Sequence, residues 1–220
     1  MSHESGFRPT ILTLTGPTCS GKSHLKELLV ARGFRPVVSF TTRQPRAGEV
    51  DGVHYHFVTE EHFEAMEQSS AFLETVRFGG CRYGSAITPD LLVGASAAKP
   101  LVLVCEPKGA ANIRAFCQST AWPLVQVFLD GGDELRARRF MGRHTQDIAA
   151  CASEEQRSKT EDGYVHRLRE IAVTEAAWRA AARSGFQPYE LVVDQFDENT
   201  QRWTIQAILD RLGMAQEFAT

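Results

Sequence analysis

The chain has 220 residues, of which 43% are hydrophobic and 23% charged, a composition typical of a globular protein with one substantial core. Its 24 basic and 27 acidic residues give a net charge of −3, so no basic field predicts a nucleic-acid partner. No apolar run is long enough to span a bilayer, and the polar start MSHESGFRPT lacks the apolar centre of a signal peptide. We therefore expect a cytoplasmic protein without a membrane partner.

The five cysteines are scattered, odd in number and free of any C-x-x-C pair. This pattern favours reduced thiols over a disulfide framework or a zinc site. It agrees with the expected cytoplasmic location.

A β-rich run (Thr10 to Thr15) comes first and is followed by a glycine-rich loop and a helical pattern that ends at Gly33. Residues Gly16 to Ser23 read G-x-x-x-x-G-K-S, the spacing of a phosphate-binding loop, and the strand–loop–helix context makes that match specific. We expect ATP to bind all eight residues of the loop: Gly16, Pro17, Thr18, Cys19, Ser20, Gly21, Lys22 and Ser23.

Each chemical group of this loop has a predicted task. The two glycines allow the backbone N–H groups to approach phosphate oxygens, helped by the positive end of the helix dipole. Lys22 is expected to neutralise the β- and γ-phosphates, and the Ser23 hydroxyl to bind Mg²⁺.

Further along the chain, short apolar runs alternate with helical patterns, which predicts a parallel sheet covered on both faces. The predicted strands are Pro100 to Cys105, Pro123 to Leu129 and Tyr189 to Val193. The predicted helices are Gly109 to Cys117, Asp133 to Gly142, Asp162 to Arg183 and Glu198 to Leu212.

Two segments interrupt the alternation. Residues Val37 to Leu92 are dense in Thr, Arg, Gly and aromatic residues around a short helix (Thr59 to Ser69), which predicts a mixed insert with its own small sheet. The segment Gly142 to Asp162 is polar and weakly patterned, and we interpret it as a mobile flap.

Several side chains of the insert suit an anionic acceptor. Arg43, Arg46, Tyr55 and Tyr83 supply donors for a phosphate. Glu74 lies in an otherwise apolar stretch, where a carboxylate can accept bonds from N1–H and N2–H₂ of guanine but leaves adenine unmatched. The alternative interpretation is that Glu74 is an exposed strand residue and the arginines belong to a solvated loop.

Glu106 ends the apolar run that begins at Leu101. This position is suited to act on Mg²⁺, directly or through water, or on the acceptor. The alternative is an ordinary charged residue at a strand end.

Three stretches resemble guanylate kinase: S-x-T-T-R-x-P-R-x-G-E-x-x-G-x-x-Y-x-F from Ser39 to Phe57, F-L-E from Phe72 to Glu74, and Y-G-S from Tyr83 to Ser85. The resemblance extends from about Ile11 to about Leu212. It implies that Ser39, Glu74 and Ser85 contact the guanine, and that the two arginines and two tyrosines named above hold the GMP phosphate. Glu106 is included in the expected GMP site.

The segment RFMGR resembles the arginine motif of the family's lid. The resemblance implies that Arg139 and Arg143 approach the ATP phosphates, with Arg167 as a weaker match. Lys22, Arg43, Arg139 and Arg143 are the expected catalytic residues.

The sequence departs from the family pattern after the core strand, where VCEPKG replaces the usual acidic-apolar-acidic-x-Gln-Gly. The lid reads Arg143-His144-Thr145 in place of Arg-Gly-Thr, and Val-Asn-Asp near the last strand becomes Val193-Asp194-Gln195. These departures suit a divergent enzyme with an altered nucleotide preference.

The prediction is an α/β P-loop NTPase fold: a three-layer core with a parallel sheet (residues 1–36, 95–141 and 163–220), a mixed α/β GMP-binding insert (37–94) and a lid (142–162). The predicted reaction transfers the γ-phosphate of ATP to GMP or dGMP with Mg²⁺. One alternative is a kinase for a modified guanine deoxynucleotide. Another is a non-catalytic module of the same fold that binds a phosphopeptide. The sequence carries no signal for the oligomeric state.

Overall fold

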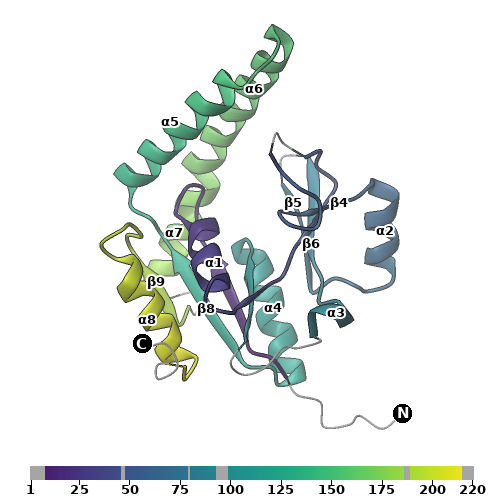
Figure 1. Ribbon diagram of the computed structural model, residues 1–220, viewed down its shortest axis with the longest axis vertical. Helices are drawn as coiled ribbons and strands as arrows, with labels where there is room; N and C mark the ends of the chain where they lie inside the picture. Colours follow the sequence, from purple (N-terminus) through teal and green to yellow (C-terminus); the bar gives the residue numbers. More distant parts are fainter. Residues whose placement is uncertain (1–7, 46–47, 79, 93–98, 186–188, 215–220) are drawn as a thin grey trace.

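The computed structural model describes residues 8–45, 48–78, 80–92, 99–185 and 189–214. Within them the chain forms a core around one sheet, an insert around a second sheet, and a long helical arm (Figure 1).

The core sheet has five parallel strands in the order β2-β7-β1-β8-β9. Their bounds are β1 Ile11–Thr15, β2 Arg35–Pro36, β7 Leu101–Val104, β8 Leu124–Leu129 and β9 Leu191–Val193. All five residues of β1 are buried, because helices cover both faces of a parallel sheet. Four of these strands match the predicted runs, whereas the short edge strand β2 was not predicted.

Helices α1 (Lys22–Val30) and α8 (Gln201–Arg211) cover one face of the core sheet, and α4 (Pro107–Thr120) covers the other. Leu12 of β1 belongs to the apolar cluster of the first face, whereas its neighbour Ile11 belongs to the cluster that contains α4. This alternation follows from the two-residue period of a strand. It confirms the predicted three-layer core.

The insert contains a four-stranded mixed sheet in the order β4-β3-β6-β5. Its elements are β3 Phe40–Thr41, β4 His56–Phe57, α2 Glu60–Gln68, β5 Glu74–Phe78, β6 Cys81–Ser85 and α3 Pro89–Leu92. Phe63 of α2 is fully buried and stacks on Phe72 at a ring distance of 4.5 Å. The predicted small sheet and its helix are confirmed.

The arm consists of α5 (Asp133–Ala149), α6 (Glu154–Glu170), a π-helical turn η1 (Ile171–Glu175) and α7 (Ala176–Arg183). Helices α5 and α6 lie side by side and project from the core (Figure 1). The predicted end of the first helix at Gly142 is therefore wrong, because α5 continues to Ala149. Most of the segment 142–162, which we interpreted as a mobile flap, is helical.

Local interactions explain the helical structure of this polar segment. Ser153 caps α6 by accepting a bond from the Gln156 backbone N–H at 3.2 Å. Exposed ion pairs four residues apart follow, such as Lys159 with Glu155 at 2.6 Å. Tyr164 joins the two helices through a 2.7 Å hydrogen bond to Asp147.

None of the helices in the described ranges is both long enough and apolar enough to cross a bilayer.

Candidate functional site

A cavity of about 220 Å³ lies where the glycine-rich loop, the insert and the base of the arm meet. The residues that line it are Gly16, Thr18, Lys22, Ser39, Arg43, Tyr55, Glu74, Val76, Tyr83, Val104, Cys105, Glu106, Arg167, Glu175 and Trp178. Most of the residues predicted to bind the acceptor therefore share one cavity with Gly16, Thr18 and Lys22 of the glycine-rich loop.

The glycine-rich loop connects the carboxyl end of β1 to α1. At Gly16 the φ angle is +145°, and a Cβ there would lie 2.0 Å from the carbonyl oxygen of Leu129, so only glycine fits. Lys22 donates from Nζ to the carbonyl oxygens of Gly16 and Pro17 at 2.8 and 2.7 Å. Burial lowers the pKa of Lys22 to about 8, although the charge of Glu175 acts in the opposite direction.

The remaining loop residues lie around this lysine. Cys19 has a left-handed φ of 62°, Ser20 is buried against the Gly131 backbone, and Gly21 has φ +105° beside Phe196. Ser23 is exposed in the first turn of α1.

On the acceptor side, Glu74 is 6% exposed, and its Oε2 has no hydrogen-bond partner within the described residues. Burial raises the pKa of Glu74, while a hydrogen bond from Ser85 opposes that rise. Ser85 also contacts Ser39, with 3.1 Å between the hydroxyl oxygens. The interpretation of Glu74 as an exposed strand residue is therefore wrong, and the three predicted guanine contacts lie together.

Arg43 pairs with Glu49 through two hydrogen bonds of 2.9 Å, and its guanidinium lies 5.4 Å from the centre of the Tyr55 ring. The Tyr55 and Tyr83 rings meet edge to face at 5.9 Å. Arg46 lies outside the described residues. The predicted phosphate-binding side chains that are described therefore form one aromatic and cationic wall of the cavity.

Glu106 precedes α4 at its N-cap position, but its side chain does not cap the helix. Burial raises the pKa of Glu106 to about 7, with further contributions from the charges of Glu74 and Glu170. Within the described ranges, no three His, Cys, Asp or Glu side chains cluster as a metal site.

The arginines of the arm occupy different places. Arg139 donates to the carbonyl oxygens of Cys19 and Phe196 at 3.3 and 2.7 Å, so it lies against the loop. Arg143, one turn further along α5, is exposed. Arg167 of α6 lines the cavity.

Sequence reasoning missed Arg136, Glu175 and Trp178, which belong to the base of the arm. Arg136 and Glu175 are 6% and 4% exposed and pair at 2.6 Å between Nη2 and Oε2. In the sequence, Arg136 and Glu175 look like ordinary charged residues of polar helices. Their role depends on a contact between residues 39 positions apart, which no local pattern reveals.

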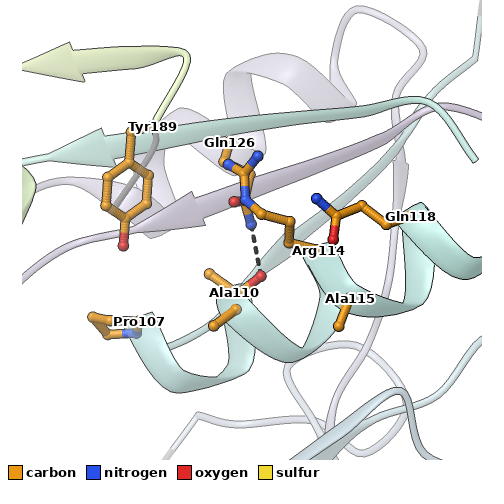
Figure 2. Close-up of a pocket in the computed structure, with 8 residues that line it drawn as sticks. Pro107, Ala110, Arg114, Ala115, Gln118, Gln126 and Tyr189 are labelled. Atoms are coloured by element: carbon orange, nitrogen blue, oxygen red, sulfur yellow. Dashed lines mark hydrogen bonds between the residues drawn. The ribbon is translucent and has the colours of Figure 1, made fainter. Parts of the chain in front are cut away.

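A second, smaller cavity of about 130 Å³ lies between α4 and the core sheet (Figure 2). Its lining includes alanine methyl groups, and two of its polar side chains, Gln126 and Arg114, are already bonded within the protein. Gln126 donates to the Ala110 carbonyl at 2.8 Å, and Arg114 pairs with Glu190 at 3.3 Å. The first cavity, with its unpartnered carboxylate oxygen, is therefore the candidate functional site.

Comparison with known proteins agrees with this geometry. The family model described as guanylate kinase matches residues 8–208. The guanylate kinase of Bifidobacterium longum is 35% identical over 179 residues, which cover 78% of this chain and 89% of the relative. That of Frankia casuarinae is 35% identical over 180 residues, covering 79% and 93%. The crystal structure of guanylate kinase from Anaplasma phagocytophilum superposes with a TM-score of 0.57 at 22% identity, covers 93% of this chain and 87% of its own, and supports the fold alone.

A phosphate-loop core whose cavity is lined on another side by residues of an insert is the arrangement of P-loop nucleoside monophosphate kinases. Within that class, the match over most of the chain and the identities above 30% show that the protein belongs to the guanylate kinase family. It is an ATP-dependent kinase, and the non-catalytic alternative is not favoured.

Proposed function

We propose that this chain transfers the γ-phosphoryl group of ATP to GMP or dGMP in the 220 Å³ cavity. The observation that carries the proposal is the buried, unpartnered Oε2 of Glu74 in a cavity shared with Lys22. A buried acceptor without a donor is costly, and guanine N1–H and N2–H₂ supply donors that adenine lacks. Binding of guanine would also favour the ionised form of this carboxyl, whose pKa burial raises.

In this proposal Ser39 and Ser85 assist Glu74 in holding the base. Arg43, Tyr55 and Tyr83, together with Arg46, bind the acceptor phosphate, which shares the Arg43 guanidinium with Glu49. None of these contacts involves the sugar 2′ position, so the proposal includes both GMP and dGMP.

On the donor side, residues 16–23 bind ATP. Lys22 exchanges its bonds with the Gly16 and Pro17 carbonyls for bonds with phosphate oxygens, whose negative charge would raise its pKa again. Arg139 and Arg143 approach the same phosphates and stabilise charge as the phosphoryl group moves. The proposal divides the chain into a core, a GMP-binding insert (37–94) and a lid (142–162), and this lid lies within the helical arm formed by α5 and α6.

Mg²⁺ fits the donor set, because Ser23 offers a hydroxyl and Glu106 a carboxylate whose pKa of about 7 a nearby cation would lower. Two protein oxygens are few, which suits an ion that takes its other ligands from phosphates and water. When bound, Mg²⁺ neutralises phosphate charge and orients the phosphates.

The test compares GMP and AMP as acceptors for the wild type and for Glu74→Gln. Gln keeps the size of the side chain but loses the charge and directs a donor at the guanine N–H groups. We expect kcat/KM for GMP to fall by about 2–4 kcal/mol, roughly 30- to 1,000-fold, while the low rate with AMP stays similar.

Glu64→Gln on the exposed face of α2 is the matched control and should leave the GMP to AMP ratio unchanged. An unchanged ratio in Glu74→Gln as well would overturn the proposed recognition of guanine.

A further inference from the structure

One peptide group of the phosphate loop is held by side chains from the arm. The Thr18 backbone N–H donates to Glu175 Oε1 at 2.8 Å. Arg136 donates from Nε to the Thr18 carbonyl at 3.0 Å. The same two side chains pair with each other at 2.6 Å, so loop, α5 and η1 form a closed set of three bonds.

This set of bonds lies beside the strained part of the loop. Cys19, the next residue, has a left-handed φ of 62°, which costs a non-glycine residue about 1–3 kcal/mol and persists only where neighbours enforce it. Arg139 holds the Cys19 carbonyl as well, at 3.3 Å. The base of the arm therefore fixes two successive carbonyls and one N–H of the loop.

Glu175 is also an unusual charge to find at a site for a polyanion. It is 4% exposed, lines the cavity beside Lys22, and belongs to a π-helical turn, a form often found at functional sites. Alone, its charge would repel ATP. Arg136 balances it, and Asp133 lies 3.7 Å from the Arg136 guanidinium on the solvent side.

We propose that Glu175 and Arg136 are positioning residues for ATP: both hold the Thr18 peptide in its phosphate-binding conformation, and Arg136 also offsets the Glu175 charge that would otherwise repel the nucleotide. The proposal rests on the assignment of residues 16–23 to ATP. It places the two residues in contact with the loop and not with the reacting atoms.

The two single variants should differ, because Arg136→Met leaves a negative charge beside the ATP phosphates and Glu175→Gln leaves a positive one. Arg136→Met leaves a buried carboxylate without its counter-charge, so KM for ATP should rise at least about tenfold, because breaking a buried pair from one side leaves an uncompensated charge. Glu175→Gln keeps an acceptor for the Thr18 N–H and should raise KM for ATP only about threefold. The double variant should have a lower KM for ATP than Arg136→Met, since the repelling charge is gone.

The experiment measures kcat and both KM values, with calorimetric binding of ADP as a readout that needs no turnover. KM for GMP should stay within about twofold in all three variants, since the acceptor wall is untouched. A merely structural pair would lower the melting temperature and leave the KM for ATP of the folded enzyme unchanged. Arg136→Lys, which keeps the charge, provides a folded variant with an intermediate KM for ATP if Arg136→Met does not fold.

The exposed pair Arg138–Glu134 on the same helix supplies matched controls. Arg138→Met and Glu134→Gln should leave every constant unchanged. The proposal is overturned if Arg136→Met and Arg136→Lys both retain the wild-type KM for ATP, or if the double variant binds ADP no better than Arg136→Met. Failure of the wild type to bind ADP would instead contradict the assignment of the loop to ATP.

Discussion

Helices cover the core sheet and also form the arm, but different interactions stabilise the helices of these two regions. Each residue of β1 is buried, and α1 and α8 pack their apolar sides against the sheet. In α6 no residue is buried, and its contacts include a cap, ion pairs four residues apart, and aromatic contacts and a Tyr164–Asp147 hydrogen bond with α5. The core is therefore stabilised by burial and the arm largely by local bonds.

The difference has a functional consequence at the point where the two regions meet. The arm contacts the loop through Arg136, Arg139 and Glu175, which are polar groups, so bonds and charges rather than apolar packing couple it to the site. Such an element can be stable as a helix pair and yet shift its position relative to the core, because polar contacts can be exchanged for those of a ligand.

The largest expected effect lies in the core. Lys22→Ala should lower kcat by about a thousandfold or more, because it removes the charge that the loop directs at the phosphates. Circular dichroism should show an intact fold, since burial already disfavours the charge of Lys22, as its pKa of about 8 indicates. A kcat near that of the wild type would contradict the role of the loop in phosphoryl transfer.

A smaller effect is expected where the core touches the insert. A Cβ on Gly109 of α4 would lie 2.7 Å from Glu74 Oε2, so Gly109→Ala must displace the carboxylate. We expect the GMP to AMP ratio of kcat/KM to fall about tenfold, as a misplaced binding group loses part of its discrimination.

Gly163→Ala is the matched control for that substitution, because a Cβ there meets nothing within 4 Å. The GMP to AMP ratio of kcat/KM in Gly163→Ala should equal that of the wild type. A ratio that falls equally in both variants would show that the cause is not the contact with Glu74.

The smallest effect should be confined to the arm. Ser153→Ala removes the cap of α6 and should reduce its local stability by about 1 kcal/mol, while the global melting temperature changes little. Hydrogen exchange of amides in α6 is the measurement.

Gly163→Ala should have the opposite effect and slow the exchange of the same amides, since alanine stabilises helix interiors by about 1 kcal/mol over glycine. Equal loss of protection in the core would contradict the separation of the two regions.

Much of the fold could be predicted because its signals are local in the chain. Strands β1, β7, β8 and β9 are short apolar runs, and the loop combines glycine spacing with a strand before it and a helix after it. The helical structure of residues 142–162 was not predicted because these polar residues have no apolar periodicity, and α6 buries none of its side chains. Their own signals are Ser153 with Gln156 three residues later, and charges of opposite sign four residues apart.

The sequence by itself determined the phosphate loop, the three-layer core and the residue types of the acceptor wall, since each depends on residues close together in the chain. Only the tertiary structure decided that β2 pairs at the sheet edge, that Glu74 is buried, and that Glu175 reaches the Thr18 N–H across 157 positions of the chain. Contacts of this kind depend on how separate elements pack, and no local pattern of residues encodes that packing.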